Sequence, residues 1–255
     1  MTLIRSLTVL AKAGKRSITR RWIVAAATVV VVALGAGFVW WFTAGSGDAG
    51  PRAVTADEAS RLAITRFRNY EARGRAVTIS VPDPAGGLVV TASVDYRTKA
   101  GYGVVKGKAR NDSGDGLIRW TAARVALHPM PATPGQAPAR PPADDWFGRP
   151  LNPTGGVLDR ALAIVLGLGG DRPDNAQLLP QNGAAWVGSD LINGHPVDVF
   201  TGPESRDRPG TAESVRYWLD ANGVMYRVQA TVAGETDPVV IDFDSHEFIA
   251  VPPTG

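Results

Sequence analysis

The chain has no cysteine and only three histidines among its 255 residues. The lack of cysteine excludes disulfide bonds, thiolate metal sites, a thiol nucleophile and attachment of a lipid to an N-terminal cysteine. His128, His195 and His246 stand apart and form no HExxH or related zinc motif. No GxxxxGK[ST] phosphate loop and no GxSxG nucleophile elbow is present. We therefore expect no enzymatic activity, no cofactor and no metal site.

Acidic residues are absent from the first 21 positions, which carry six basic side chains. These are Arg5, Lys12, Lys15, Arg16, Arg20 and Arg21. The net charge of +3 thus comes from the N-terminal tail, and the rest of the chain is close to neutral for its size. A large basic groove for nucleic acid is not supported.

Charged residues are also missing from Trp22 to Phe42, and a helix over this run is long enough to cross the roughly 30 Å hydrocarbon layer of a bilayer. The basic residues precede the run, so the positive-inside rule predicts a cytoplasmic tail (1–21), one transmembrane helix (22–42) and an extracytoplasmic remainder. The excess of Arg over Lys is typical of a GC-rich bacterium, so we expect a bacterial cell membrane. The alternative is a cleaved signal peptide, although such apolar regions usually span only 7–15 residues.

Beyond the membrane segment, the small polar residues 43–54 predict a spacer, and a domain follows over 55–255. Thr55 and Glu58 have the spacing of a capping box, and apolar residues at helical intervals continue to Gly74. A second helix is expected over 157–166, where the sequence is apolar nearly all round.

Alternating apolar and polar residues predict about nine or ten strands and two or three helices, without parallel βαβ alternation. The expected strands lie near 77–81, 88–96, 102–109, 117–127, 184–189, 195–201, 214–219, 224–232 and 238–243. A change of parity within 117–127 indicates a bulge that bends that strand. Six prolines in 129–142 predict a long irregular loop or lid. The fold class is therefore α+β with an antiparallel sheet.

Two groups of residues are candidates for a site. Asp242, Asp244 and His246 share one strand face, but successive side chains on such a face lie about 6.6 Å apart, which favours a solvated surface over an ion site. Trp146, Phe147 and Trp186 are candidates for lining an apolar ligand cavity, while the alternative is that they belong to the core.

The C-terminal part of the sequence carries a family resemblance. The hairpin around Asp220-Ala-Asn-Gly223, the later strand Asp237–Phe243, the terminal Ile249–Pro253 and the earlier hairpin Ser189–Phe200 resemble the closing strands of the LolA-like carriers, in particular the actinobacterial LppX and LprG lipoprotein group. In the hairpin, Asp220 is expected to be a turn former and Gly223 to adopt a positive φ.

The resemblance implies a curved antiparallel half-barrel, covered by helices over an apolar cavity that holds lipids or lipidated partners in the family. It offers no catalytic residues, and the chain lacks the family's anchoring cysteine. The sequence therefore predicts a single-pass extracytoplasmic protein that binds a lipid or another apolar ligand. The alternative is a structural or sensory module that contacts an envelope protein and has no small-molecule ligand.

Overall fold

The computed structural model describes residues 50–83, 86–108, 114–130, 132–203, 215–232 and 234–253. The expected cytoplasmic tail, the transmembrane helix 22–42 and most of the spacer lie outside these ranges, so they stay predictions. Within the described ranges, no helix combines the length and the apolar character needed to cross a membrane.

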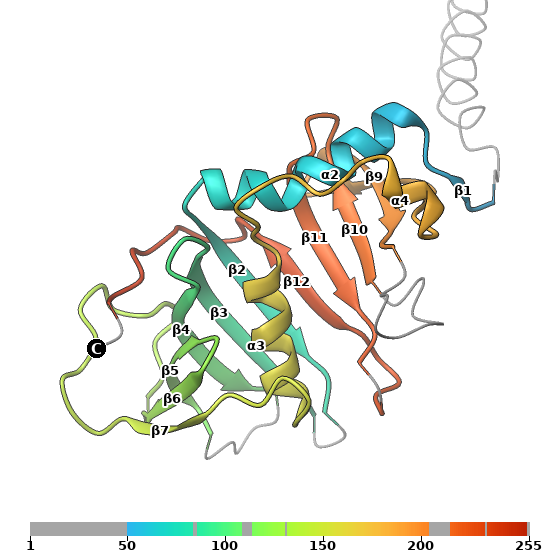
Figure 1. Ribbon diagram of the computed structural model, residues 1–255. Helices are drawn as coiled ribbons and strands as arrows, with labels where there is room; N and C mark the ends of the chain where they lie inside the picture. Colours follow the sequence, from blue (N-terminus) through green and yellow to red (C-terminus); the bar gives the residue numbers. More distant parts are fainter. Residues whose placement is uncertain are drawn as a thin grey trace, which may run out of the picture. The chain divides into compact units, whose positions relative to one another are not determined.

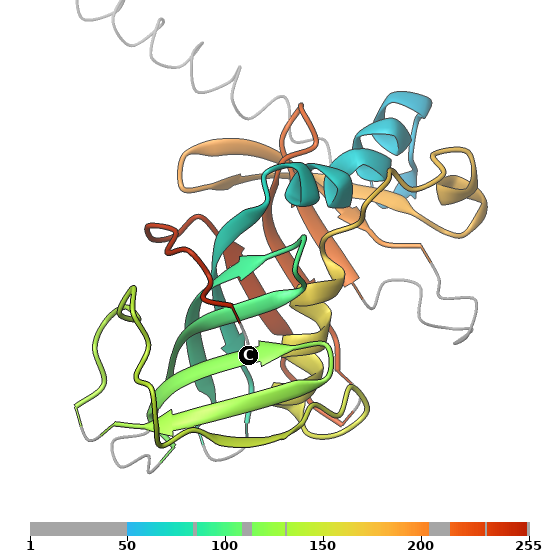
Figure 2. The ribbon, with the colours of Figure 1, turned by 60° about the vertical axis from the view of Figure 1, so that its left-hand side comes forward.

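Twelve strands of the described chain form one antiparallel sheet in the order β1-β8-β9-β10-β11-β12-β2-β3-β4-β5-β6-β7. The strands are β1 (Arg52–Ala53), β2 (Gly74–Val81), β3 (Leu88–Asp95), β4 (Ala100–Gly107), β5 (Gly116–Thr121), β6 (Arg124–Pro129), β7 (Phe147–Pro150), β8 (Ala185–Ile192), β9 (His195–Thr201), β10 (Val215–Leu219), β11 (Met225–Ala230) and β12 (Val239–Phe243). Three helices, α2 (Ala56–Glu71), α3 (Val157–Gly167) and α4 (Leu178–Gln181), accompany it. The sheet curls around α3 and stays open, with β1 and β7 at its edges (Figures 1 and 2).

The antiparallel α+β architecture is confirmed, but the expected number of strands is wrong. Two short edge strands were missed, including Arg52–Ala53 in the predicted spacer. The segment 117–127 holds two strands instead of one bulged strand, because Thr121 closes a turn. Its hydroxyl accepts hydrogen bonds from the backbone N–H groups of Ala123 (3.3 Å) and Arg124 (3.2 Å).

Helix α2 begins at the predicted capping box. The Thr55 hydroxyl accepts from the N–H of Glu58, and the Glu58 carboxylate accepts from the N–H of Thr55. The helix buries Leu62 and Ala63 in the main core and lies across one end of β2, β10 and β11 (Figure 1). An amphipathic helix thereby covers part of the face toward which the sheet curls.

Helix α3 occupies the concave side of the sheet. Ala161, Leu162 and Val165 are fully buried in the main core, where α3 packs against β2. Burial of these side chains explains why this helix is apolar on most of its surface. The space in front of β2 and β3 is therefore filled by a helix.

The opposite face of the sheet is covered by two irregular segments. The Pro-rich loop buries Ala137 against Tyr102 and Leu117, and the Tyr102 hydroxyl donates to the carbonyl of Pro138 at 3.0 Å. Near the C-terminus, the N–H of Ile249 donates to the hydroxyl of Ser93 at 2.8 Å. The described part of the Pro-rich loop thus packs on the side away from the helices.

The guanidinium of Arg75 on β2 joins four separate segments. It donates to the Asn69 side chain of α2 (2.9 Å), to the carbonyl of Met225 on β11 (2.9 Å) and to the Asp244 carboxylate after β12 (3.0 Å). Asn69 in turn donates to the carbonyl of Leu168 at the end of α3 (2.9 Å). Both Asn69 and Arg75 are buried, so their polar atoms depend on these partners.

We expect Arg75→Met to lower the free energy of unfolding by about 2–4 kcal/mol, because it leaves the Asn69 oxygen and the Met225 carbonyl buried without donors. Urea unfolding followed by tryptophan fluorescence measures the loss. The matched control is Arg68→Met on the exposed face of α2, which should cost less than about 1 kcal/mol. Similar losses in both variants would contradict the role assigned to Arg75.

Candidate functional site

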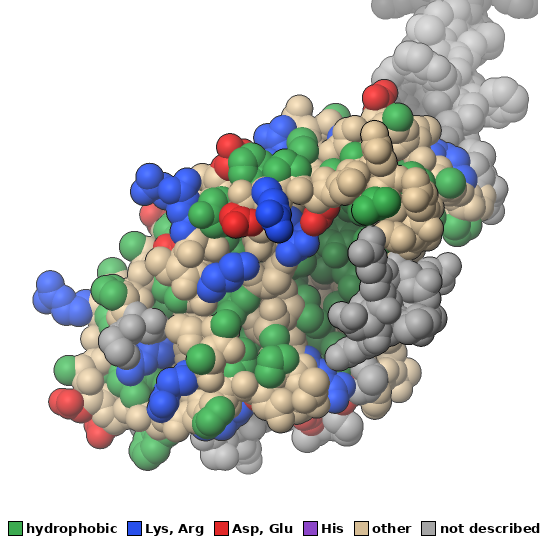
Figure 3. Space-filling model, in the orientation of Figure 1, with side chains coloured by type: hydrophobic (Ala, Val, Ile, Leu, Met, Phe, Trp, Pro, Cys, Tyr) green, Lys and Arg blue, Asp and Glu red, His purple; other side chains and the backbone are tan. Residues whose placement is uncertain are grey.

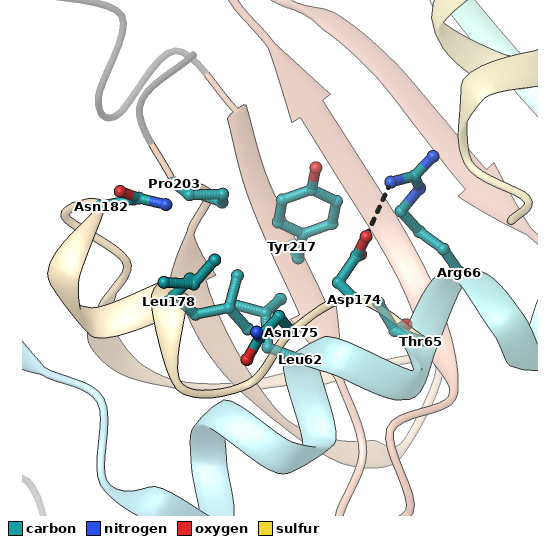
Figure 4. Close-up of a pocket in the computed structure, with 10 residues that line it drawn as sticks. Leu62, Thr65, Arg66, Asp174, Asn175, Leu178, Asn182, Pro203 and Tyr217 are labelled. Atoms are coloured by element: carbon teal, nitrogen blue, oxygen red, sulfur yellow. Dashed lines mark hydrogen bonds and ion pairs between the residues drawn. The ribbon is translucent and has the colours of Figure 1, made fainter. Parts of the chain in front are cut away.

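A pocket of about 240 Å³ lies between α2, the segment leading into α4, and the inner face of β10. We call it the α2–α4 pocket. It is lined by Leu62, Thr65, Arg66, Asp174, Asn175, Leu178, Leu179, Asn182, Pro203 and Tyr217. The space-filling view shows a hollow with a hydrophobic interior on this side of the domain (Figure 3), and Figure 4 shows the lining residues.

The apolar part of the lining comes from three elements. Leu62 projects from α2, Leu178 and Leu179 come from α4, and the ring of Tyr217 stands on β10 between them and the ion pair Arg66–Asp174 (Figure 4). The alternation of β10 places Tyr217 on the face with the helices, while Trp218 packs in a cluster on the other face. An apolar molecule can therefore replace water against these side chains.

An ion pair borders the pocket. Arg66 Nη1 lies 3.1 Å from Asp174 Oδ1, and both side chains are about two-fifths exposed, at 38% and 39%. Arg66 Nε also donates to the carbonyl of Gly167 at 3.0 Å, and the N–H of Asp174 donates to the carbonyl of Ala63 at 2.9 Å. These bonds fix the segment before α4 against α2 and hold the two charges together.

The remaining polar groups in the lining are uncharged. Thr65 is 1% exposed, and its hydroxyl has no hydrogen-bond partner among the residues that the structure describes. Burial raises the pKa of Tyr217, so its hydroxyl stays protonated at neutral pH. The Asn175 side-chain oxygen accepts from the N–H of Gln177 at 3.0 Å. The pocket thus combines apolar side chains with neutral hydrogen-bonding groups and one ion pair, Arg66–Asp174.

The structure places Trp146 and Phe147 away from this pocket. Trp146 packs with Tyr102 and Leu117 on the face opposite the helices, where Arg119 stacks on its ring at 4.3 Å. Its indole N–H donates to the carbonyl of Pro142 at 2.9 Å. Phe147 begins the edge strand β7 and is 70% exposed.

Trp186 lies at the other end of the sheet, on β8. Its indole N–H donates to Asp198 at 3.1 Å, and Arg52 stacks on its ring at 4.5 Å. Asp198 also binds Arg61 of α2 at 2.8 Å. Burial raises the pKa of the Asp198 carboxylate, but hydrogen bonds from Trp186, Arg61 and Ser189 together lower that pKa below its usual value. The structure therefore does not bring Trp146, Phe147 and Trp186 together in one cavity.

The acidic residues singled out in the sequence have structural roles. Asp242 pairs with Arg227 at 2.6 Å, and Asp244 pairs with Arg75. No group of three His, Cys, Asp or Glu side chains suited to a metal ion occurs in the described ranges. The side chain of Asp220 accepts from the N–H groups of Asn222 and Val224, both at 2.8 Å, which confirms it as a turn former.

Gly223 is required in the same turn for two reasons. Its φ is +75°, as expected, and a Cβ atom at this position would lie 2.8 Å from the carbonyl oxygen of Arg61. The β10–β11 hairpin thereby packs directly on α2, which sets the position of Tyr217 relative to Leu62.

The sequence does not predict the α2–α4 pocket, because its lining residues come from three distant segments. Leu62 lies in the expected helix after Thr55 and Tyr217 in the expected strand near 214–219, but nothing in the sequence predicted that Asp174 would meet Arg66. The only local signal was the run of Gly, Pro and Asn before α4, which is typical of an irregular segment.

Comparison with known proteins gives distant structural neighbours only. No family model matches the chain, and no curated protein matches it in sequence. LprF from Mycobacterium bovis is 12% identical with a TM-score of 0.41, over 80% of this chain and 100% of that chain. A DUF1329 family protein from Desulfovibrio piger is 10% identical with a TM-score of 0.32, over 73% and 90%.

A third structure, a domain named for outer membrane lipoprotein sorting from Vibrio parahaemolyticus, is 9% identical with a TM-score of 0.27. The match spans 75% of this chain and 92% of that domain. At these values the neighbours assign neither a family nor a function to this chain.

Arg52, which stacks on Trp186, also pairs with Glu58. This pair predicts that Glu58 makes a pH-dependent contribution to the stability of the fold. Two hydrogen bonds of 2.7 Å from Arg52 lower the pKa of Glu58 from its usual 4.5 to about 2. The charged carboxylate therefore stabilises the fold above pH 4.5, and this stability is lost as the pH falls toward 2. Since the Arg52 side chain is 43% exposed, solvent screening keeps this contribution to stability small.

Glu58→Gln should remove this part of the pH dependence, as measured by urea unfolding at several pH values between 4.5 and 2. The matched control is Asp57→Asn, an exposed position in the same helical turn, which should keep the dependence of the unchanged protein. An unchanged pH profile in the Glu58 variant would refute the assignment.

Proposed function

We propose that this protein binds a small apolar or amphipathic ligand, such as a lipid chain, in the α2–α4 pocket. The observation that carries the proposal is the pocket itself, with Leu62, Leu178 and Tyr217 lining it and polar groups at its border. The resemblance of the C-terminal strands to LolA-like carriers supports the same class of ligand. The name of the third structural neighbour refers to lipoprotein sorting, which agrees with this direction.

The volume of the pocket limits what it can hold. At about 30 Å³ for each water-sized group, 240 Å³ accommodates about eight such groups. Burial of eight methylene groups contributes about 6 kcal/mol, which lies between the binding free energies of a 1 mM and a 1 μM complex. The proposed ligand is therefore a single short chain or one end of a longer lipid, bound with modest affinity.

The proposed location is the outer side of a bacterial cell membrane, with residues 22–42 as a single uncleaved anchor. The support is the uncharged run of 21 residues behind a strongly basic tail. An anchored protein with this domain would bind its ligand close to the membrane surface and would not cross the envelope as a free carrier.

A second candidate is a module that binds an envelope protein. Phe147 is 70% exposed on the edge strand β7, and Leu191 is 66% exposed near the end of β8. An edge strand can accept a further strand from a partner, and an exposed aromatic side chain adds apolar contact area. This candidate requires a protein partner and no bound small molecule.

We expect purified protein equilibrated with 1-octanoylglycerol to show the bound complex by native mass spectrometry, and Leu178→Trp to lower its occupancy by about tenfold. The larger side chain would fill the pocket from the half-buried end of α4. The matched control is Leu191→Trp, which adds the same group at a site outside the pocket and should keep full occupancy. Equal occupancy in both variants, or no amphiphile at all, would favour the protein-binding module.

We expect the full chain to stay in the membrane fraction after carbonate extraction and to retain its first 49 residues by intact mass. Deletion of 22–42 should move the chain to the soluble fraction, since this run is the proposed anchor. A mature protein that begins after Phe42 would show that the segment is a cleaved signal peptide.

A further inference from the structure

The charges around the α2–α4 pocket indicate which class of amphiphile it selects. Among the ten lining residues that the structure describes, Arg66 and Asp174 are the charged ones, and they are paired at 3.1 Å. We infer that the pocket prefers an amphiphile with an uncharged, hydroxyl-bearing head group over one with a carboxylate. This inference rests on the proposed function and makes it more specific.

The ion pair leaves little net positive charge for an anion. Arg66 already donates to Asp174 and to the carbonyl of Gly167, so a carboxylate ligand would compete with a carboxylate that is held in place. It would also approach the Asp174 charge, and like charges at short distance repel each other. An anionic head group would thus lose hydration without gaining an unpaired cation.

The neutral groups of the lining suit a hydroxyl head group. Thr65 is 1% exposed and its hydroxyl lacks a partner among the described residues, so a ligand hydroxyl that reaches it would satisfy a buried polar atom. Asn182 and Tyr217 also line the pocket, and no hydrogen bond to either side chain is found within the described ranges. A hydroxyl can both donate to and accept from such groups, whereas a carboxylate can only accept.

The test compares two probes of the same chain length, octanoic acid and 1-octanoylglycerol, each with a diazirine at the end of the chain. The full chain is held in nanodiscs of neutral lipid at pH 7 and irradiated with each probe. Mass spectrometry measures labelling of peptides from α2 and from 174–182, relative to the peptide containing Phe147. This reference corrects for the different partition of the two probes into the lipid.

We expect the glycerol ester to label the pocket peptides at least about threefold more than the acid. A difference in affinity of this size is what one partly exposed ion pair can produce. Asp174→Asn should raise labelling by the acid by a similar factor, because it leaves the Arg66 charge unpaired. The control is the double variant Arg66→Gln with Asp174→Asn, which removes both charges and should restore the preference for the ester. Circular dichroism confirms that each variant is folded.

The outcomes separate the inference from the function on which it rests. Equal labelling of the pocket by both probes, or no gain of acid labelling in Asp174→Asn, would overturn the charge selectivity and leave ligand binding intact. Absence of pocket labelling by either probe in all variants would overturn ligand binding itself.

Discussion

The arrangement of this domain depends on the buried Arg75 guanidinium, which donates to three acceptors: the Asn69 side chain, the Met225 carbonyl and the Asp244 carboxylate. Through Asn69 and Met225 it connects α2 to β11, and through Asn69 it also reaches the carbonyl of Leu168 at the end of α3. A buried guanidinium tolerates few geometries, because each unmatched N–H costs free energy. The positions of both long helices relative to the sheet are therefore linked at one point. The α2–α4 pocket lies beside that point, since Leu62 and Arg66 belong to the same helix as Asn69.

The location of the pocket follows from how the sheet is filled. Helix α3 buries Ala161, Leu162 and Val165 against the curled half of the sheet, so these side chains form the core there. At β10 the cover passes to α2 and the short α4, and these two helices do not close over Tyr217. The half-barrel implied by the family resemblance is thus present as an open curved sheet (Figure 2), and the α2–α4 pocket lies between α2, α4 and β10 (Figure 4).

Local signals in the sequence predicted local structure well. The capping box at Thr55 and Glu58, the apolar helix at 157–167 and the turn at Asp220 depend only on residues within a few positions of each other. The turn at Thr121 was misread as a bulge because a change of parity is common to both, and only pairing of β5 with β6 separates them. Contacts between distant segments were not predictable: Arg75 and Asp244 are 169 positions apart, and Arg66 and Asp174 are 108 apart. Trp146 shows the same limit, since its apolar surroundings come from a loop folding onto the outer face of the sheet.

The modest size of the pocket bears on what an anchored protein could do with a ligand. A complex between 1 mM and 1 μM, formed at a typical rate of about 10⁶ M⁻¹s⁻¹, dissociates in about a second or faster. A carrier that crosses the envelope needs longer retention, whereas a protein fixed in the membrane can exchange ligand with its surroundings. Occupancy would then follow the local concentration of the amphiphile. The paired charges of Arg66 and Asp174 fit such exchange, because they impose no strong electrostatic trap on the ligand. On the proposed function, the domain is therefore better suited to sampling or presenting an apolar molecule at the membrane than to carrying it away.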